Sequence, residues 1–326
     1  MKIYVYDVAD FEEKIFAKLQ KEINDELAFS KESCNLDTLE KAKGFDGITT
    51  LGYSKINEAI LRKMKEYNIK YISTRTIGFD HIDVAKAKEL GISVFHANYE
   101  PNNVADFTVM MMLILLRKAK VSICRALVND FSLNGMLGKE MRSLTIGVIG
   151  TGKIGTTVIK NLSGFGCNII AYDLYQNNTV KQYARYVSIE EIYKQSDIIT
   201  LHIPLTDSNY HMITKETIAK MKKGVIIINT ARGGLINTED LISGLESGHI
   251  GGAGIDTLEE ETTVMHKDIG TKVIEERSLL YLKQFPNVLY TQHYGFFTEE
   301  ATEMMARCGI KSIQLAAAGL ENPFEI

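Results

Sequence analysis

The feature that most constrains this chain is a glycine-spaced turn near its middle. A short apolar run at residues 144–149 ends in Gly150-x-Gly152-x-x-Gly155, and a helix-compatible segment follows. In such a strand–turn–helix unit, the first glycine permits a tight turn, the second lets the backbone approach a pyrophosphate, and the third lets the helix pack on the strand. The helix N-terminus then offers free N–H groups to the phosphates. The pattern predicts a dinucleotide-binding Rossmann unit; the alternative is a glycine-rich turn in another α/β protein.

The next apolar run of this unit ends in an acid. Residues 168–172 lead into Asp173, which lies 18 residues beyond Gly155. A carboxylate at this place can accept hydrogen bonds from both ribose hydroxyls and repels a 2′-phosphate. The sequence therefore predicts NAD, rather than NADP, as the cofactor.

Strand-like and helix-like segments alternate on both sides of the glycine turn. The alternation runs from residue 3 to residue 95 and starts again at residue 145. Such repetition is typical of parallel sheets with helices on both faces. The expected fold class is α/β with two doubly wound parallel-sheet domains, a Rossmann NAD-binding domain being inserted into a flavodoxin-like substrate domain. The strands expected in the second series lie at residues 145–149, 168–172, 198–202, 225–229, about 251–256 and about 287–291.

Two long helices indicate the domain boundaries. The first follows Pro101 and is expected from residue 103 to about 120, where it crosses into the nucleotide domain. The second, from residue 299 to about 320, follows the last strand of that domain, so its expected destination is the first domain. The sequence therefore predicts a substrate-binding domain of residues 1–98 and 297–326, and an NAD-binding domain of residues 99–296.

Charge and cysteine content argue against several kinds of partner. The net charge is −4, which favours neither nucleic acid nor an anionic membrane surface. The four cysteines have no paired spacing, which argues against a disulfide framework and a zinc site, and we expect no metal. The first residues are typical of a strand rather than a signal peptide, and the most apolar run, residues 109–116, is too short to span a bilayer. The expected location is the cytoplasm.

Polar signatures follow several of the expected strands. Gly150, Asp173, His202, Arg232 and Asp256 each stand at or just beyond the carboxyl end of one strand. Ligands of open parallel sheets bind outside these ends, so we expect the five residues to converge on one edge. Arg232, within Thr-Ala-Arg-Gly-Gly, is suited to fork onto a carboxylate or a polarised carbonyl. The alternative is an arginine whose stem packs against the domain edge.

His293 and Glu261 are the candidates for acid–base chemistry. Imidazole has a pKa of about 6.5, and a carboxylate on its other nitrogen would raise that pKa and hold the tautomer. The imidazolium could then donate a proton to a ketone oxygen. The two residues are 32 positions apart, however, and on spacing alone each is typical of a surface residue.

The motifs together resemble those of the D-isomer-specific 2-hydroxyacid dehydrogenase family. The resemblance extends over essentially the whole chain and is closest to the D-lactate dehydrogenase branch. One departure is Gln292, since the family usually has proline before the histidine. The segments that carry the resemblance are Gly150-Thr-Gly-Lys-Ile-Gly155, Leu201-His-Ile-Pro-Leu-Thr206, Thr230-Ala-Arg-Gly-Gly234, Gly254-Ile-Asp-x-x-x-x-Glu261, and His293 shortly before Phe296-Phe-Thr298.

The resemblance implies roles for individual residues. Arg232 would bind the substrate carboxylate and carbonyl, His293 would be the acid/base, and Glu261 would tune it. Ile77, Gly78, Tyr99 and Phe296 would bind the substrate. The residues implied to bind the cofactor are Val104, Gly150, Gly152, Lys153, Ile154, Gly155, Asp173, His202, Ile203, Pro204, Asn209, Thr230, Ala231 and Asp256.

The expected function is NADH-dependent reduction of a 2-keto acid to the D-2-hydroxy acid, first of all pyruvate to D-lactate. Larger amino-acid-derived 2-keto acids, as in D-2-hydroxyisocaproate or D-phenyllactate dehydrogenases, are the alternative. A more distant alternative is an NAD-sensing co-regulator without catalytic activity. Three consecutive methionines begin at Met110. Such a stripe is typical of a core or a subunit interface, and the resemblance implies a homodimer through this helix.

Overall fold

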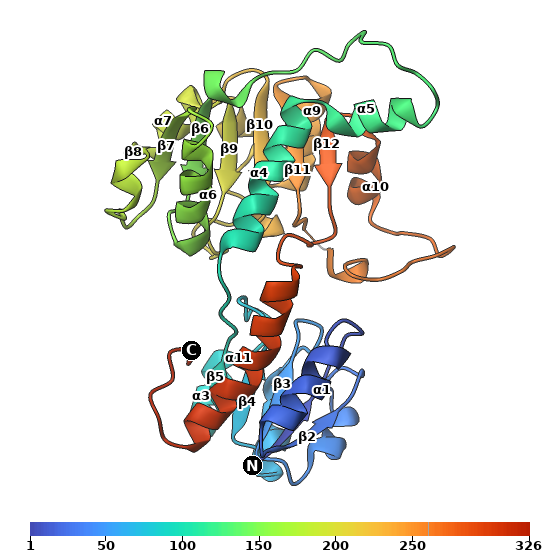
Figure 1. The fold of residues 1–326 in the computed structure, drawn as a ribbon, viewed down its shortest axis with the longest axis vertical. Coiled ribbons are helices and arrows are strands. Elements are labelled where there is room, and N and C mark those ends of the chain that lie inside the picture. Colours follow the sequence, from blue (N-terminus) through green and yellow to red (C-terminus); the bar gives the residue numbers. More distant parts are fainter. Residues whose placement is uncertain (260) are drawn as a thin grey trace. The chain divides into compact units, whose positions relative to one another are not determined.

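The computed structural model describes residues 1–259 and 261–326, which divide into two compact units (Figure 1). Unit 1 is formed by Met1–Glu100 together with Phe297–Ile326, and unit 2 by Pro101–Phe296. Both are layered α/β structures built on one sheet, which confirms the expected fold class. Among the described residues, no helix has the length and apolar character needed to cross a membrane.

Unit 1 contains a five-stranded parallel sheet in the order β2-β1-β3-β4-β5, the order of flavodoxin-like folds. Alternation along β1 separates its two faces. Ile3 and Val5 pack with α1 and α11, which lie side by side, and Tyr4 and Tyr6 belong to the core under α2 and α3 (Figure 1). The elements are β1 (Lys2–Val5), α1 (Glu13–Glu22), β2 (Glu26–Phe29), η1 (Thr38–Ala42), β3 (Gly47–Thr50), α2 (Glu58–Glu66), β4 (Tyr71–Thr74), α3 (Val84–Leu90), β5 (Ser93–Phe95) and α11 (Glu299–Ala317).

Unit 2 contains a seven-stranded parallel sheet in the order β12-β11-β10-β9-β6-β7-β8. The strand order reverses between β6 and β9, which is the usual site of nucleotide binding in such sheets. The strands are β6 (Thr145–Ile149), β7 (Asn168–Tyr172), β8 (Arg185–Tyr186), β9 (Ile198–Leu201), β10 (Val225–Asn229), β11 (Ile250–Ile255) and β12 (Val288–Tyr290).

Helices cover both faces of this second sheet. Met111 and Met112 of α4 pack with α6 in one core, whereas α7, α9 and α10 contribute to the other. The helices are α4 (Asn102–Leu116), α5 (Ala119–Ala126), η2 (Met141–Ser143), α6 (Lys153–Ser163), η3 (Val180–Gln182), α7 (Ile189–Gln195), α8 (Lys215–Ile218), η4 (Gly233–Leu235), α9 (Thr238–Glu246), η5 (Glu261–Thr263) and α10 (Arg277–Gln284).

One local expectation was wrong, and one strand was not expected. The helix expected to reach residue 120 ends at Leu116, because Lys118 adopts a left-handed backbone (φ +51°) and the chain then restarts as α5. The carbonyl of Leu116 accepts a hydrogen bond from the N–H of Lys139, so a segment distant in the sequence satisfies a carbonyl at the C-terminus of α4. The two-residue strand β8 was not expected; it pairs with Ile170 and Ala171 of β7.

Candidate active site

The three glycines of the turn after β6 meet different surroundings. Gly150 has φ +97°, and a Cβ there would lie 2.5 Å from the carbonyl oxygen of His202. A Cβ on Gly155 would lie 2.0 Å from the carbonyl oxygen of Gly150, so α6 begins in contact with the turn. A Cβ on Gly152 would meet nothing within 4 Å. The turn is thus tight on its inner side and open at Gly152, and this arrangement fits a dinucleotide phosphate placed against the start of α6.

Asp173 is fastened to this turn. Its Oδ2 accepts hydrogen bonds from the N–H and the hydroxyl of Thr151, and its Oδ1 accepts one from the N–H of Tyr175. Burial by itself would raise the pKa of Asp173, but the hydrogen bonds from Tyr175 and Thr151 outweigh burial and hold the pKa below its ordinary value. The carboxylate is therefore charged at neutral pH, as recognition of ribose hydroxyls requires.

His202 backs the turn from the end of β9. Its ring Nε2 lies 2.9 Å from the hydroxyl of Thr200, and its backbone N–H donates to the carbonyl of Ile149. Burial lowers the pKa of His202 to about 3, so the ring is neutral. In the following loop, Asn209 donates from Nδ2 to the carbonyl of Pro204. These contacts shape the loop that contains the predicted cofactor residues Ile203 and Pro204; direct contact with NAD stays a prediction for all of them.

Arg232 follows β10 in an extended conformation and is half-buried. Its Nη1 donates to the carbonyl of Ala231, and its own carbonyl accepts from the Nδ2 of Asn229. The next residue, Gly233, contacts the backbone of Leu258, because a Cβ there would lie 2.2 Å from the Leu258 carbonyl carbon. Thr230 in turn shares a hydrogen bond of 2.9 Å with Thr108 of α4. The turn that carries Arg232 is therefore fixed by two contacts, one with the backbone of Leu258 and one with Thr108 of α4.

The structure pairs Glu261 with His293. Oε1 of Glu261 lies 2.8 Å from Nδ1 of His293, and Oε2 accepts a hydrogen bond from the N–H of Leu258. His293 follows β12 with a left-handed backbone (φ +56°), and its N–H donates to the carbonyl of Asp256. Since a carboxylate can only accept, Nδ1 is the protonated nitrogen and Nε2 is the one that can exchange a proton with a substrate oxygen.

Asp256 holds the segment around His293. Its buried carboxylate accepts hydrogen bonds from the hydroxyl of Thr291 and from the N–H groups of Tyr294 and Gly295. All of these contacts lie within unit 2. They make Asp256 an anchor for the histidine-bearing segment, and its predicted position near the nicotinamide stays a prediction.

Sequence reasoning did not single out His266. Its Nε2 lies 3.0 Å from the carbonyl oxygen of His293, and its ring centroid is 6.3 Å from that of His293 and 5.9 Å from that of Phe296. A carbonyl can only accept, so Nε2 of His266 is the donor. The only sequence sign of this contact was indirect: Gln292 stands where the family usually has proline, so the histidine could need other backbone support.

A second histidine–glutamate pair lies nearby and was also not expected. Nε2 of His211 is 2.6 Å from Oε1 of Glu259, and its Nδ1 is 3.2 Å from Nδ2 of Asn237. The Oδ1 of Asn237 accepts from the N–H of Asp240, which leaves its Nδ2 as the donor to His211. Both ring nitrogens of His211 are thus committed, so this pair cannot exchange protons with a substrate in the way that the Glu261–His293 pair can.

The predicted residues of unit 1 follow two strands: Ile77 and Gly78 come after β4, and Tyr99 comes after β5. The hydroxyl of Thr76 donates to the carbonyl of Gly78, which folds Thr76–Gly78 into a compact turn around Ile77. The preceding Arg75 is fully buried and donates to the carboxylate of Glu12 at 2.7 and 3.0 Å. Substrate binding by Ile77, Gly78 and Tyr99 stays a prediction, as does that by Phe296 in unit 2.

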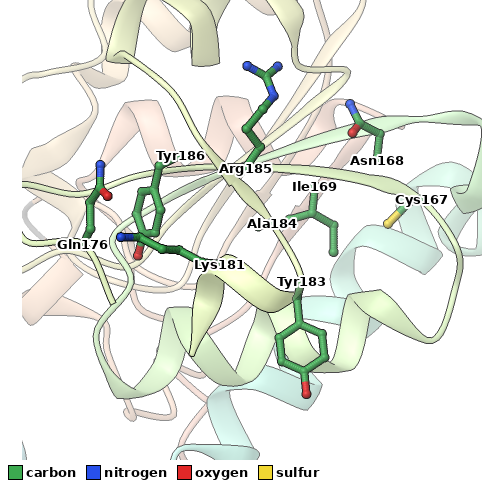
Figure 2. A pocket seen from close by; sticks show the side chains of 9 residues that line it. All are labelled: Cys167, Asn168, Ile169, Gln176, Lys181, Tyr183, Ala184, Arg185 and Tyr186. Carbon is green, nitrogen blue, oxygen red and sulfur yellow. The ribbon is translucent and has the colours of Figure 1, made fainter. Parts of the chain in front are cut away.

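A surface cavity of about 670 Å³ lies elsewhere in unit 2 (Figure 2). It is lined by Asn168 and Ile169 at the amino end of β7, whereas Asp173 follows the carboxyl end of that strand. Figure 2 shows the side chains of Arg185 and Tyr183 pointing in opposite directions. No catalytic candidate is among the residues that line the cavity, but the hydroxyl of Tyr186, which lines it, donates to the hydroxyl of Thr151 in the glycine turn at 2.8 Å.

Comparisons with known proteins show the family to which the chain belongs. Residues 109–295 match the model of the NAD binding domain of the D-isomer specific 2-hydroxyacid dehydrogenases. The chain is 46% identical over 316 residues to an aromatic 2-oxoacid reductase of Clostridium sporogenes, with 96% of each chain covered. It is 37% identical over 315 residues to a D-lactate dehydrogenase of Lactiplantibacillus plantarum, covering 96% of this chain and 95% of the relative.

A solved structure shows the same fold over the full length. The structure of a D-2-hydroxyisocaproate dehydrogenase matches with a TM-score of 0.91 at 34% identity, covering 100% of this chain and 99% of the other. The expected family and the expected cofactor, NAD, are thereby confirmed. The protein belongs to the D-isomer specific 2-hydroxyacid dehydrogenase family and is an NAD-dependent oxidoreductase.

Proposed function

We propose that this enzyme reduces the carbonyl group of a 2-keto acid with NADH, using Arg232, Glu261 and His293 as its catalytic residues. The observation that carries the proposal is the Glu261–His293 pair, with its carboxylate oxygen 2.8 Å from Nδ1. A carboxylate in this position stabilises the imidazolium and fixes which nitrogen faces the substrate.

The residues divide the chemistry between them. When bound at the glycine turn, NADH supplies a hydride to the substrate C2. His293 donates the proton on Nε2 to the carbonyl oxygen, and Glu261 keeps the proton on Nδ1. The fork-shaped guanidinium of Arg232 holds the substrate carboxylate and polarises the carbonyl. In the reverse direction, neutral His293 accepts the hydroxyl proton.

The proposed cofactor contacts follow the carboxyl edge of the unit 2 sheet. Asp173 binds the adenosine ribose, and the backbone from Gly150 to Gly155 holds the pyrophosphate. We assign the remaining contacts to Val104, His202, Ile203, Pro204, Asn209, Thr230, Ala231 and Asp256. On the substrate side, we assign Ile77 and Gly78 to the substrate carboxylate, and Tyr99 and Phe296 to the substrate side chain.

A 2-keto acid with an aromatic side chain is the first substrate to test. The support is the 46% identity to the Clostridium sporogenes aromatic 2-oxoacid reductase over nearly the whole chain. Pyruvate is the second candidate, supported by the 37% identity to a D-lactate dehydrogenase. Both reactions use the same acid–base pair, so the difference between them depends on the side-chain pocket alone.

The decisive experiment measures NADH oxidation with phenylpyruvate, 2-ketoisocaproate and pyruvate, and determines the handedness of each product by chiral chromatography. His293→Ala removes the general acid and should lower kcat by about 10²–10⁴-fold. Arg232→Ala removes a charge-assisted anchor and should lower kcat/KM by roughly 10²–10³-fold. Both variants should still bind NADH, as measured by nucleotide fluorescence.

His249→Ala is the control, because His249 donates to the carbonyl of Met221 at the far end of β11. It should reduce the 2-keto acids at the wild-type rate. Normal turnover by His293→Ala or Arg232→Ala would contradict the assigned mechanism, and an L-2-hydroxy acid as product would contradict the assigned handedness.

A further inference from the structure

The carboxylate of Glu259 joins three segments of unit 2. Oε1 lies 2.6 Å from Nε2 of His211 and accepts from the hydroxyl of Tyr210 at 3.3 Å. Oε2 accepts from the N–H and the hydroxyl of Thr238, at 3.0 and 2.7 Å. Glu259 therefore connects its own segment after β11 with the loop after β9 and with the start of α9. These hydrogen bonds outweigh the effect of burial, which alone would raise the pKa of Glu259, and they hold that pKa below its ordinary value.

The backbone of Leu258 and Glu259 touches both parts of the proposed catalytic machinery. On one side, a Cβ on Gly233 would lie 2.2 Å from the carbonyl carbon of Leu258 and 2.4 Å from the nitrogen of Glu259. Gly233 directly follows Arg232 in the chain. On the other side, the N–H of Leu258 donates to Oε2 of Glu261 at 2.9 Å. Any displacement of this backbone segment would move the arginine turn, the Glu261 carboxylate, or both.

The loop after β9 also contacts the turn that carries Arg232. The N–H of His211 donates to the carbonyl of Gly234 at 2.8 Å, and the ring of Tyr210 is so close that a Cβ on Gly234 would lie 3.2 Å from it. Glu259 holds both Tyr210 and His211 through its Oε1. Arg232 therefore stands on a turn that is enclosed by two segments, and Glu259 is the side chain that ties those segments together.

The charge of Glu259 suits this task. Four groups donate hydrogen bonds to this carboxylate: the hydroxyl of Tyr210, Nε2 of His211, and the N–H and the hydroxyl of Thr238. Nε2 of His211 carries the proton because Nδ1 accepts a hydrogen bond from the Nδ2 of Asn237. A carboxylate can accept from all four. A glutamine of the same shape would turn its NH₂ group toward at least one of these donors and break that contact.

We propose that Glu259 is a positioning residue, which sets Arg232 and the Glu261–His293 pair in the mutual arrangement that reduction of the 2-keto acid requires. The inference rests on the proposed roles of Arg232 and His293. Glu259 itself would touch neither the substrate nor the cofactor. Its effect passes through the backbone of Leu258 and Glu259.

The test compares Glu259→Gln with Glu190→Gln, a control that also removes one negative charge but does so at an exposed ion pair with Lys220. Small misplacements of catalytic groups are costly, so Glu259→Gln should raise the KM for the 2-keto acid and lower kcat, each by roughly tenfold. The Kd for NADH should be unchanged. The basic limb of the pH profile of kcat/KM should move to lower pH, because the His293 imidazolium loses part of its stabilisation by Glu261.

A second variant keeps the test independent of folding. His211→Phe retains a ring next to Tyr210 but removes the donor to Glu259, and it should change the KM for the 2-keto acid and the pH profile in the same direction. If both variants keep the wild-type KM and pH profile, or if they lose only thermal stability and the amount of active enzyme, the positioning role is wrong. Failure of the proposed function is seen separately, as wild-type activity in His293→Ala and Arg232→Ala.

Discussion

In the described part of unit 2, His293 and His211 each lie within hydrogen-bond distance of a glutamate, and the surroundings of the second ring nitrogen distinguish them. In His293, the pairing of Nδ1 with Glu261 leaves Nε2 for a substrate. In His211, Nε2 faces Glu259 and Nδ1 faces the amide of Asn237. A short histidine–carboxylate distance is therefore weak evidence for catalysis until the other nitrogen has been accounted for.

The sequence could suggest His293 and Glu261 as acid–base candidates, but it could not pair them with each other. They are separated by 32 positions and meet because β11 and β12 are neighbours in the sheet, so that the segments after both strands leave the same edge. The resemblance to a known family supplied the pairing. Glu259 and His266 carry no recognisable motif, and their contacts depend on how loops from different strands pack.

The hydrogen bond from His266 to the carbonyl of His293 should affect turnover. His266→Phe keeps a ring beside Phe296 but removes the donor, at a cost of about 1 kcal/mol. If this cost falls on the orientation of His293, kcat should drop roughly fivefold. His266→Gln retains a side-chain N–H and should recover most of kcat.

His249→Phe is a matched control for this prediction, because His249 also bonds a backbone carbonyl, that of Met221, but far from the candidate site. Steady-state kinetics with one 2-keto acid compares the three variants. Equal kcat values for His266→Phe and the wild type would show that the contact has no part in turnover.

Asp173 should decide the choice between NADH and NADPH. Hydrogen bonds from Tyr175 and Thr151 lower its pKa, so the carboxylate keeps its charge from pH 8 down through the ordinary carboxyl range. A 2′-phosphate facing this charge is disfavoured by several kcal/mol. The ratio of kcat/KM for NADH to that for NADPH should therefore be large and constant between pH 6 and 8.

Asp173→Asn removes the charge with little change of shape and should reduce that ratio by at least about tenfold. The measurement is the initial rate with each nucleotide at a fixed concentration of 2-keto acid. A wild-type enzyme that used both nucleotides equally well would contradict this prediction.

At the scale of elements, periodicity and turn glycines predicted most of the framework, because these signals act over a few residues. The break between α4 and α5 escaped prediction, since it depends on residues far along the chain. The carbonyl of Leu116 is taken by the N–H of Lys139, and the Nζ of Lys118 donates to the carbonyl of Gly135. No local pattern in residues 103–120 contains that information. The strand β8 escaped for a related reason, because two residues form a strand only when a neighbour such as β7 accepts them.

The packing of α11 on the unit 1 sheet predicts an effect of Gly309→Ala. A Cβ there would lie 2.8 Å from Cγ of Arg75 and 2.9 Å from the hydroxyl of Thr49. Arg75 cannot move aside, because Glu12 and the carbonyls of Tyr6 and Asp7, which directly follow β1, hold its guanidinium. Alanine gains about 1 kcal/mol of helix propensity, and overpacking costs about 1–3 kcal/mol.

The net result should be a loss of about 1 kcal/mol in the free energy of unfolding, measured by urea denaturation. Gly164→Ala, at the end of α6, is the control, because Gly164 has helical backbone angles and a Cβ there would have its nearest neighbour at 3.6 Å. That variant should be neutral or slightly stabilising. A Gly309→Ala protein as stable as the wild type would show that the Arg75 side chain can move to make room for the added Cβ.

At the scale of the whole molecule, the exposed apolar surface favours self-association through α5 and the loop that follows it. Met111 and Met112 are buried in the core of unit 2, so the methionine helix offers mainly Met110 at the surface. The segment beyond it exposes far more: Leu127, Val128, Phe131, Leu133 and Leu137 are each 74–90% exposed. Large exposed apolar patches mark interaction sites. The homodimer expected through the helix around Met110 stays a prediction, and the exposed surface adds this segment to the contact expected of it.

Light scattering coupled to gel filtration should give twice the 36.5 kDa mass of the chain. The double variant Phe131→Glu, Leu133→Glu places charges in the apolar segment and should shift the enzyme toward monomer. Lys181→Glu, on the opposite edge of the unit 2 sheet near β8, should leave the mass unchanged. A monomeric wild-type enzyme would contradict the inferred association.

The position of α11 has a consequence for biosynthesis. On the sheet face of unit 1 that carries Ile3 and Val5, the core is completed by Ile310 and Ile313 of α11, near the end of the chain. Unit 2, by contrast, is one continuous stretch, Pro101–Phe296. A ribosome that adds about 5–20 residues per second releases the whole nucleotide-binding unit before it makes the helix that the first unit needs. The segment synthesised first is thus completed last, and during that interval its apolar sheet face is the part of the nascent protein most in need of protection from aggregation.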